Sequence, residues 1–178
     1  RSAAALQELV TTCCKVLREA ESYEIDAEEL VPGDLVVLEA DTHRGMMSLV
    51  RDLNRLYSEL PALHRHDFEH QGFEWIDCND SLSSTLSLIR KGRSAEDSLI
   101  IVCNFTPVPR YNYRIGVPRG GFWKEVLNSD ANLYGGSGYG NAGGDEATPI
   151  PAHGRYYSLA LVLPPLGILY FKNSVRGK

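Results

Sequence analysis

Three histidines near the middle of the chain form the one cluster in the sequence with the residue types of a metal site. They are His64, His66 and His70, with Asp67 and Glu69 between them. Alternating His64 and His66 would share a strand face, whereas His66 and His70 would lie one helical turn apart, so no single conformation brings all three to one ion. We expect no physiological metal here, and a metal-dependent hydrolase that uses this cluster stays an alternative.

Neither the glycine-rich stretch nor the cysteines predict a cofactor site. A phosphate-binding loop ends in Gly-Lys-Ser/Thr and is followed by a helix, and residues 135–144 have neither feature. We therefore predict that these residues form a mobile surface loop. The cysteines have no CxxC pair and no metal-ligand spacing with histidine, and we expect reduced, mostly buried thiols. On a helix, adjacent Cys13 and Cys14 would point about 100° apart and could not easily chelate one ion. The other cysteines are Cys78 and Cys103.

The distribution of charge divides the chain near Asp41. The net charge is −5, which argues against a nucleic-acid partner. Residues 1–41 carry a net charge of −7, and residues 42–178 carry +2. No apolar run is long enough to cross a bilayer, and the amino terminus has no long apolar leader. We therefore expect no membrane segment and a cytoplasmic protein.

The first part of the chain is predicted to form a helix followed by strand structure. Apolar residues recur at helical spacing from Ser2, which predicts a helix over at least residues 2–12. Residues 14–18 fit a strand equally well, because apolar and charged residues alternate there. Pro32 and Gly33 predict a turn that leads into a strand over residues 35–38.

The second part begins with an amphipathic helix over residues 43–60, which Pro61 ends. Its apolar stripe consists of Met46, Leu49, Val50, Leu53, Leu56 and Tyr57. Strands are predicted over residues 73–78, 84–90, 98–106, 111–117, 122–128, 155–163 and 166–171. The fold class is therefore mainly β with α: an antiparallel β-sandwich preceded by this helix and by an N-terminal helix and strand appendage. Alternation along the strands predicts an interior that contains Ile101, Cys103, Phe105, Leu161 and Leu163.

The segment that ends with residues 28–40, Glu-Glu-Leu-Val-Pro-Gly-Asp-Leu-Val-Val-Leu-Glu-Ala, resembles the beginning of the actuator domain of P-type cation-transporting ATPases. The resemblance covers about 25 residues and stops after Ala40. In that family catalysis depends on a TGES loop and on the aspartate of a DKTGT motif, and neither occurs in this sequence. The resemblance implies a local fold and no transport function.

From His43 to about Lys172 the chain resembles the carboxy-terminal part of 1,4-α-glucan branching enzymes. The strings that carry the resemblance span roughly 130 residues and include His43-Arg44-Gly45, Arg51-Asp52-Leu53-Asn54-Arg55-Leu56-Tyr57, Phe73-Glu74-Trp75-Ile76-Asp77, Asn104-Phe105-Thr106-Pro107, Tyr113-Arg114-Ile115-Gly116-Val117-Pro118, Tyr134-Gly135-Gly136-Ser137 and Leu163-Pro164-Pro165-Leu166. In that family the helix is the last of the (β/α)₈ barrel, and the strands form the carboxy-terminal all-β domain found across α-amylase relatives.

The two resemblances imply a chimera with four parts. They are the ATPase-like fragment, the barrel helix, the β-sandwich domain and a tail, at residues 1–41, 42–63, 64–172 and 173–178. The implied function is a non-catalytic accessory domain of a branching enzyme of glycogen or starch metabolism, without independent activity.

No catalytic residue is expected in this chain. Retaining glycosyl transfer needs two carboxyl groups about 5 Å apart, and the resemblance implies that both lie on absent barrel strands. The acids Asp77, Asp80 and Asp130 lie at strand ends or in turns, where Asp commonly caps its own backbone, so we expect them to be structural.

A glucan-binding module is the other alternative, because exposed aromatic rings can stack on glucose. Aromatic side chains in a sandwich more often fill the core, and we assign no residue to glucan contact. Weak α-glucan binding stays open. The candidates are Trp75, Trp123, Tyr134, Tyr139 and Phe122.

The apolar stripe of the helix over residues 43–60 would face barrel strands in an intact branching enzyme. Leaving six large apolar side chains in water would forgo on the order of 10 kcal/mol. We therefore expect the amino-terminal segment to cover the stripe, partly across a homodimer interface.

Overall fold

The structure is a computed structural model that describes residues 13–18, 21–32, 35–37, 40–94 and 97–174. The chain divides into two compact units, residues 1–44 and residues 45–178. This boundary lies close to Asp41, where the charge of the sequence changes.

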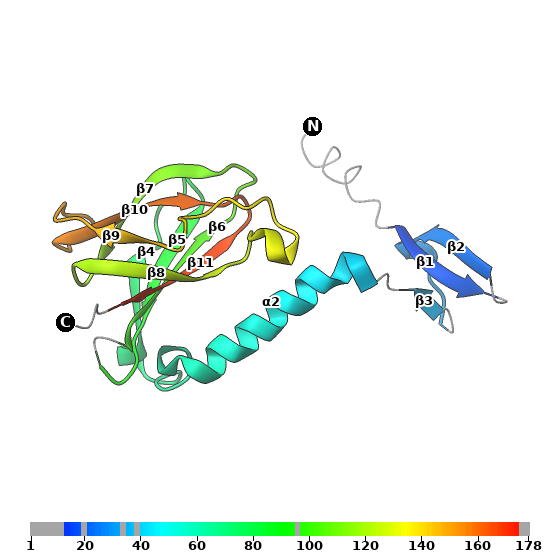
Figure 1. The fold of residues 1–178 in the computed structure, drawn as a ribbon, viewed down its shortest axis with the longest axis horizontal. Coiled ribbons are helices and arrows are strands. Elements are labelled where there is room, and N and C mark those ends of the chain that lie inside the picture. The colour runs from blue at the N-terminus through cyan, green and yellow to red at the C-terminus, as the bar shows by residue number, and fades with distance from the viewer. Residues whose placement is uncertain (1–12, 19–20, 33–34, 38–39, 95–96, 175–178) are drawn as a thin grey trace. The chain divides into compact units, whose positions relative to one another are not determined.

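The first unit contains an antiparallel three-stranded sheet with the strand order β2-β1-β3 (Figure 1). Its strands are β1 (Cys13–Arg18), β2 (Glu21–Asp26) and β3 (Leu35–Val37). Residues 14–18 thus form a strand, and β3 confirms the strand predicted after the Pro32-Gly33 turn. The helix predicted over residues 2–12 lies outside the described residues.

Helix α2 (Ala40–Glu59) agrees with the helix predicted over residues 43–60. The backbone N–H of Leu60 still donates to the carbonyl of Leu56, at 2.9 Å, and Pro61 then ends the helix because it has no N–H to continue the pattern. Short 3-10 helices lie at Ala27–Glu29, Pro61–Leu63, His70–Gly72 and Asn132–Tyr134.

Eight strands of the second unit form two antiparallel sheets (Figure 1). The larger sheet has the order β4-β5-β6-β11-β8-β9, and the smaller one pairs β10 with β7. The prediction of an antiparallel β-sandwich preceded by a helix is confirmed. The strands are β4 (Phe73–Asp77), β5 (Thr85–Arg90), β6 (Leu99–Asn104), β7 (Arg110–Val117), β8 (Gly121–Asn128), β9 (Gly144–Ala147), β10 (Tyr157–Leu163) and β11 (Ile168–Asn173).

The main core lies between the two sheets. Side chains from β7 and β10, among them Ile115 and Leu159, meet side chains from the larger sheet, among them Trp123 and Phe171. Leu161 and Leu163 belong to this core, as predicted, and both are almost completely buried.

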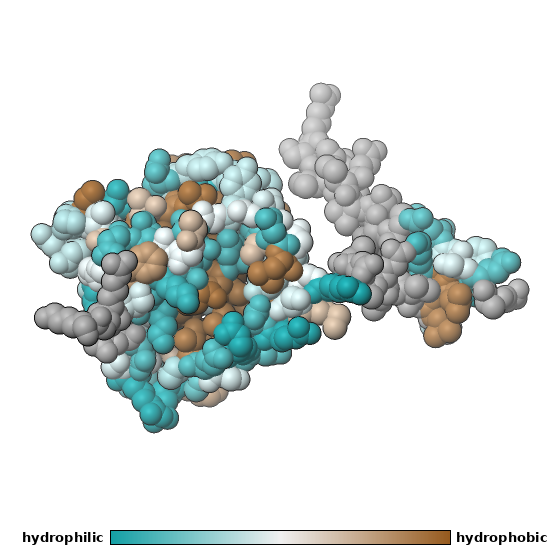
Figure 2. Space-filling model, viewed as in Figure 1, coloured by the Kyte–Doolittle hydropathy of each residue, from teal (hydrophilic) through white to brown (hydrophobic). Residues whose placement is uncertain are grey.

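A second core lies on the opposite face of the larger sheet, beneath α2. Leu56 and Leu60 pack there with Leu99, Ile101 and Leu127. Figure 2 shows hydrophobic side chains between α2 and the sheet, whereas the side of α2 that faces the viewer is mostly hydrophilic.

Three residues predicted in the interior of the sandwich lie outside the core between the two sheets. Ile101 and Cys103 face α2, because their alternating neighbours Ile100 and Val102 take the places between the sheets. Phe105 is 59% exposed, because β6 ends at Asn104 and the chain turns there.

The larger sheet covers one edge of the apolar stripe of α2. Leu56 is buried in the second core, and Leu49 and Leu53 pack against it. The other edge of the stripe stays open: Met46, Val50 and Tyr57 are 60%, 48% and 53% exposed. The larger sheet therefore covers about half of the stripe.

Candidate functional site

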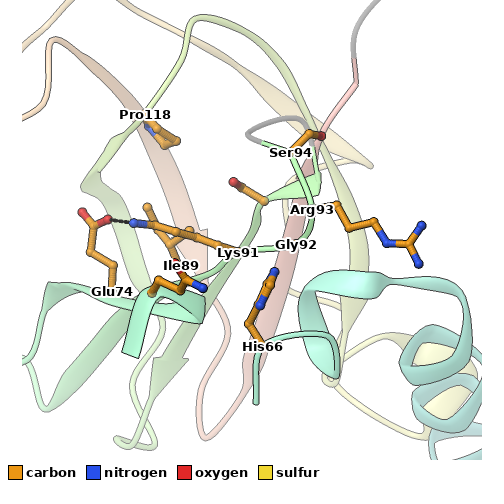
Figure 3. A pocket seen from close by; sticks show the side chains of 10 residues that line it. His66, Glu74, Ile89, Lys91, Gly92, Arg93, Ser94 and Pro118 are labelled. Carbon is orange, nitrogen blue, oxygen red and sulfur yellow. Dashed lines mark ion pairs between the residues drawn. The ribbon is translucent and has the colours of Figure 1, made fainter. Parts of the chain in front are cut away.

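A cavity of about 540 Å³ opens beside β4 and the end of β5 (Figure 3). Lys91 reaches across it to one carboxylate oxygen of Glu74, and Arg155 pairs with the other. The hydrogen bond from Lys91 is the main cause that lowers the pKa of Glu74. Glu74 is therefore ionised near neutral pH and has no proton to give to a leaving oxygen, as a general acid in glycosyl transfer must. The cavity is also lined by His66, Gln71, Arg93 and Ser98.

Asp80 lines a second cavity, of about 430 Å³, and is held by its neighbours. Its Oδ2 accepts hydrogen bonds from Tyr113 at 2.8 Å and from Thr85 at 3.3 Å, and its Oδ1 accepts from the backbone N–H of Ser83 at 3.0 Å. Burial acts to raise the pKa of Asp80, but these hydrogen bonds outweigh it and the pKa is lowered. Burial is also the main reason why the pKa of Tyr113 rises to about 12. Asp80 thus links Thr85 of β5 to Tyr113 of β7 and has a structural role.

Asp77 is likewise engaged within the fold. It accepts the backbone N–H of Asn79 at 2.9 Å, and its Oδ2 lies 3.4 Å from Nε2 of His153. Nδ1 of His153 accepts the backbone N–H of Gly116 at 3.1 Å. This chain of contacts joins β4 of the larger sheet to β7 of the smaller one.

The histidine cluster is not brought together. The ring of His64 lies against that of Tyr57, with centroids 5.5 Å apart, and Nδ1 of His66 lies 3.1 Å from Glu69. His70 is exposed. In the part of the chain that the structure describes, no three His, Cys, Asp or Glu side chains are grouped so that they could hold a metal ion.

The glycine-rich loop is built around Asp130. One carboxylate oxygen accepts the backbone N–H of Ser137, at 2.9 Å, and the other accepts the Ser137 hydroxyl and the N–H of Tyr139, at 2.7 and 3.1 Å. The main-chain carbonyl of Asp130 accepts the N–H of Gly138 at 2.8 Å. Gly138 has φ +82°, a conformation that favours glycine. These bonds fix the loop more firmly than the mobile surface loop predicted from the sequence.

The same loop is attached to α2 at two points. A Cβ at Gly45 would overlap the main-chain carbonyl of Tyr134, so glycine is needed for this close approach. The Tyr134 hydroxyl donates to Oδ2 of Asp52 at 2.6 Å. That hydrogen bond is the main cause of the lowered pKa of Asp52, and burial is the main cause that raises the pKa of Tyr134 to about 12.

The candidate aromatic residues have different environments. Trp123 is completely buried, and its Nε1 donates to the carbonyl of Arg119 at 3.2 Å. Trp75 is 46% exposed and packs edge-to-face on Phe73. Tyr134 anchors the loop, as described above, and Phe122 is half-buried on β8.

Tyr139 is exposed and faces a residue that the sequence analysis missed. The centroid of its ring lies 6.3 Å from that of Tyr111, at an interplanar angle of 73°, and Tyr111 is 62% exposed. A hydrogen bond with Tyr139 is the main cause that raises the pKa of Tyr111. The two tyrosines are 28 residues apart, and no motif links them, so only the fold could reveal the pair.

No helix within the described ranges of the chain is long and apolar enough to cross a membrane.

The sequence itself places this sandwich in a known family. The family described as "Alpha amylase, C-terminal all-beta domain" matches residues 75–174, more than half of the chain, and the chain belongs to it. The match covers all strands of the second unit except the first two residues of β4.

The similar curated proteins are branching enzymes. The chain is 53% identical over 140 residues to the 1,4-alpha-glucan branching enzyme GlgB of Aquifex aeolicus, covering 79% of this chain and 22% of the relative. The GlgB enzymes of Aromatoleum aromaticum and Burkholderia thailandensis are 58% identical over 134 residues and 54% identical over 127 residues. These matches cover 75% and 71% of this chain, and 21% and 15% of the relatives. The chain thus spans about a fifth of the length of these relatives, and its resemblance to the C-terminal domain of branching enzymes is confirmed.

Proposed function

We propose that this domain is a non-catalytic accessory domain of a 1,4-α-glucan branching enzyme, and that α2 joins it to the catalytic domain. One observation carries the proposal: the apolar stripe of α2 is wider than the surface that the larger sheet covers. Leu56 is 4% exposed, whereas Met46 and Val50, on the adjoining edge, are 60% and 48% exposed. Such an open apolar edge is typical of an interface.

The catalytic domain of the relatives is the occupant that fits this open edge. The relatives are named as branching enzymes, and about four fifths of their length lies outside the match to this chain. The carboxylates of Glu74, Asp80 and Asp130 are held by ion pairs or hydrogen bonds within the domain. The chain alone is therefore expected to have no branching activity.

The test is to reconstitute the enzyme from two pieces. A GlgB of Aquifex aeolicus that ends before the region matched by this chain would be co-expressed with the chain, and branching would be followed by the iodine colour of amylose. We expect co-purification, activity in the complex and none in either piece. Turnover by the chain alone that survives repurification would overturn the proposal, as would failure of the two pieces to associate.

A matched pair of variants makes this test specific for the open edge of α2. Val50→Asp places a charge on the open apolar edge, and Ser58→Asp places the same charge at another exposed position of α2. Only Val50→Asp should abolish association with the catalytic piece. If both variants lost association equally, the cause would be the added charge and not the open apolar edge of α2.

Without a catalytic domain, the same open edge would bring two copies of the chain into a homodimer. Light scattering coupled to size exclusion would then give the mass of a dimer for the wild type and of a monomer for Val50→Asp. A monomeric wild type would contradict the dimer. The prediction that the amino-terminal segment covers part of the stripe can be measured in the same way, with a chain that starts at Asp41.

We also propose that residues 1–41 are an ATPase-like piece joined to the branching-enzyme domain. The support is the sequence resemblance of residues 28–40 and the division of the chain after Arg44. We expect no ATP hydrolysis, which a phosphate-release assay would measure. A cytoplasmic location fits the free thiols of Cys14, Cys78 and Cys103. Cys78 is exposed and the other two are half-buried, whereas mostly buried thiols were predicted.

A glucan-binding role is the second candidate, and the exposed aromatic pair Tyr111 and Tyr139 favours it. The hydrolase alternative has no such support, since His64, His66 and His70 each contact different groups or solvent.

A further inference from the structure

We propose that Tyr111 and Tyr139 form a stacking platform for an α-1,4-linked glucan chain. The proposal rests on the proposed function, because the names of the relatives supply the substrate class, and it assigns a site to that substrate. The site itself follows from the geometry of the two rings and of the loop that holds one of them.

The backbone of Tyr139 is fixed before any ligand binds. Its N–H donates to Asp130 at 3.1 Å, and its carbonyl accepts from Nδ2 of Asn128 at 2.7 Å. Glycines flank it on both sides, and a Cβ at Gly140 would crowd the same Asn128 amide. The loop thus holds one aromatic residue in a set position, which lowers the entropy that a ligand loses by ordering it.

The two rings stay accessible although they contact each other. Tyr111 is 62% exposed and Tyr139 is 37% exposed, so part of each side chain reaches solvent although the rings are arranged edge-to-face. The face of an aromatic ring is electron-rich and attracts the positive edges of C–H groups. A glucose ring presents C–H groups on its faces and hydroxyl groups at its rim, so it can stack on such a ring.

The composition of the loop that carries Tyr139 fits a neutral, hydroxyl-rich ligand. Residues 131–143 contain no Asp, Glu, Lys, Arg or His, and they offer amides, hydroxyls and glycine backbone instead. A nucleic acid or a phosphate would need cationic side chains, which this loop lacks. The cavity beside Glu74 and Lys91 is charged and differs in this respect.

The loop also connects the platform to the surface proposed for the catalytic domain. Tyr134, in the same loop, contacts α2 through Gly45 and Asp52, and Figure 1 shows the turn at residues 132–134 beside the N-terminal half of the helix. The loop that carries Tyr139 is therefore also the loop that holds α2. The site would position substrate chains and would take no part in bond cleavage.

The experiment is native affinity electrophoresis of the whole chain in gels that contain amylose, with dextran gels to test for the α-1,4 linkage. Tyr111→Ala and Tyr139→Ala should each clearly weaken the retardation by amylose, because each removes one stacking ring. The matched control is Tyr156→Ala, because Tyr156 is 65% exposed and also packs edge-to-face on a tyrosine, Tyr157. The control should migrate like the wild type, and Tyr139→Phe should keep binding because the ring remains.

Two results would overturn the platform: a wild type that amylose does not retard, and Ala variants that amylose retards as strongly as it retards the wild type. Reconstitution with the truncated Aquifex aeolicus enzyme separates this failure from failure of the proposed function. Restored branching by both Ala variants, together with unchanged retardation, would refute the platform and leave the accessory role standing. If even the wild type restores no branching, the accessory role itself fails.

Discussion

Replacing Leu56 by alanine tests whether α2 is packed on the larger sheet as described. Leu56 is 4% exposed and belongs to the core formed with Leu99, Ile101 and Leu127. Leu→Ala changes in a core cost about 2–5 kcal/mol, and we expect about 3 kcal/mol here, because a surface helix can move partly into the space. For a domain of this size each kcal/mol lowers Tm by about 2–4 °C, so Tm should fall by about 6–12 °C.

Val50→Ala is the matched control on the same helix. Val50 is 48% exposed, and alanine is the better helix former, so we expect a change below about 0.5 kcal/mol. Urea unfolding followed by far-UV circular dichroism would give both free energies of unfolding. The described packing is wrong if Leu56→Ala destabilises the chain no more than Val50→Ala does, because then the sheet does not cover this edge of α2.

Three further perturbations test other contacts. Asn104 is 2% exposed and donates to the carbonyls of Val108 and Pro164, both at 2.8 Å, so Asn104→Ala should cost about 3 kcal/mol in urea unfolding; a cost below about 1 kcal/mol would contradict this role. Gly45→Val should lower Tm by several degrees, because its Cβ overlaps the Tyr134 carbonyl, and an unchanged Tm would contradict the close approach. The raised pKa values of Tyr113 and Tyr134, about 12 against 10.0, mean that the unfolded chain loses these protons first; stability present below pH 10 is therefore lost as pH rises toward 12. In thermal melts from pH 10 to 12, Tm should fall less for Tyr134→Phe than for the wild type. An equal fall of Tm in both proteins would refute this link between the Tyr134 pKa and stability.

Strand existence could be predicted from the sequence because alternation and turn residues are local signals. The strands predicted over residues 84–90 and 122–128 differ from β5 and β8 by one residue. β9 was missed, because Gly144–Ala147 carries two acids and a glycine and has no apolar alternation. β2 was missed for a similar reason: three of its six residues are acidic.

Which face of a strand meets which layer could not be predicted from the sequence. In β6 every residue from Leu99 to Val102 is buried, so the pattern does not distinguish the side that faces the small sheet from the side that faces α2. The same lack of contrast led to Ile101 being placed between the sheets. The pair of Tyr111 and Tyr139 was hidden for another reason, since a loop and a strand that are distant in sequence form it.

The attachment of α2 explains why its open apolar edge can serve as an interface. On one side of the buried leucines, Asp52 is held by Tyr134, and near the start of the helix Gly45 lies against the same residue. These contacts oppose rotation and sliding of α2 on the sheet, so Met46 and Val50 are presented in a fixed position. A partner that binds them then needs no further ordering of the helix, which favours association. Loss of the Tyr134 anchor should therefore weaken association with the catalytic domain more than it lowers the free energy of unfolding, since Leu53 and Leu56 still hold the helix on the sheet.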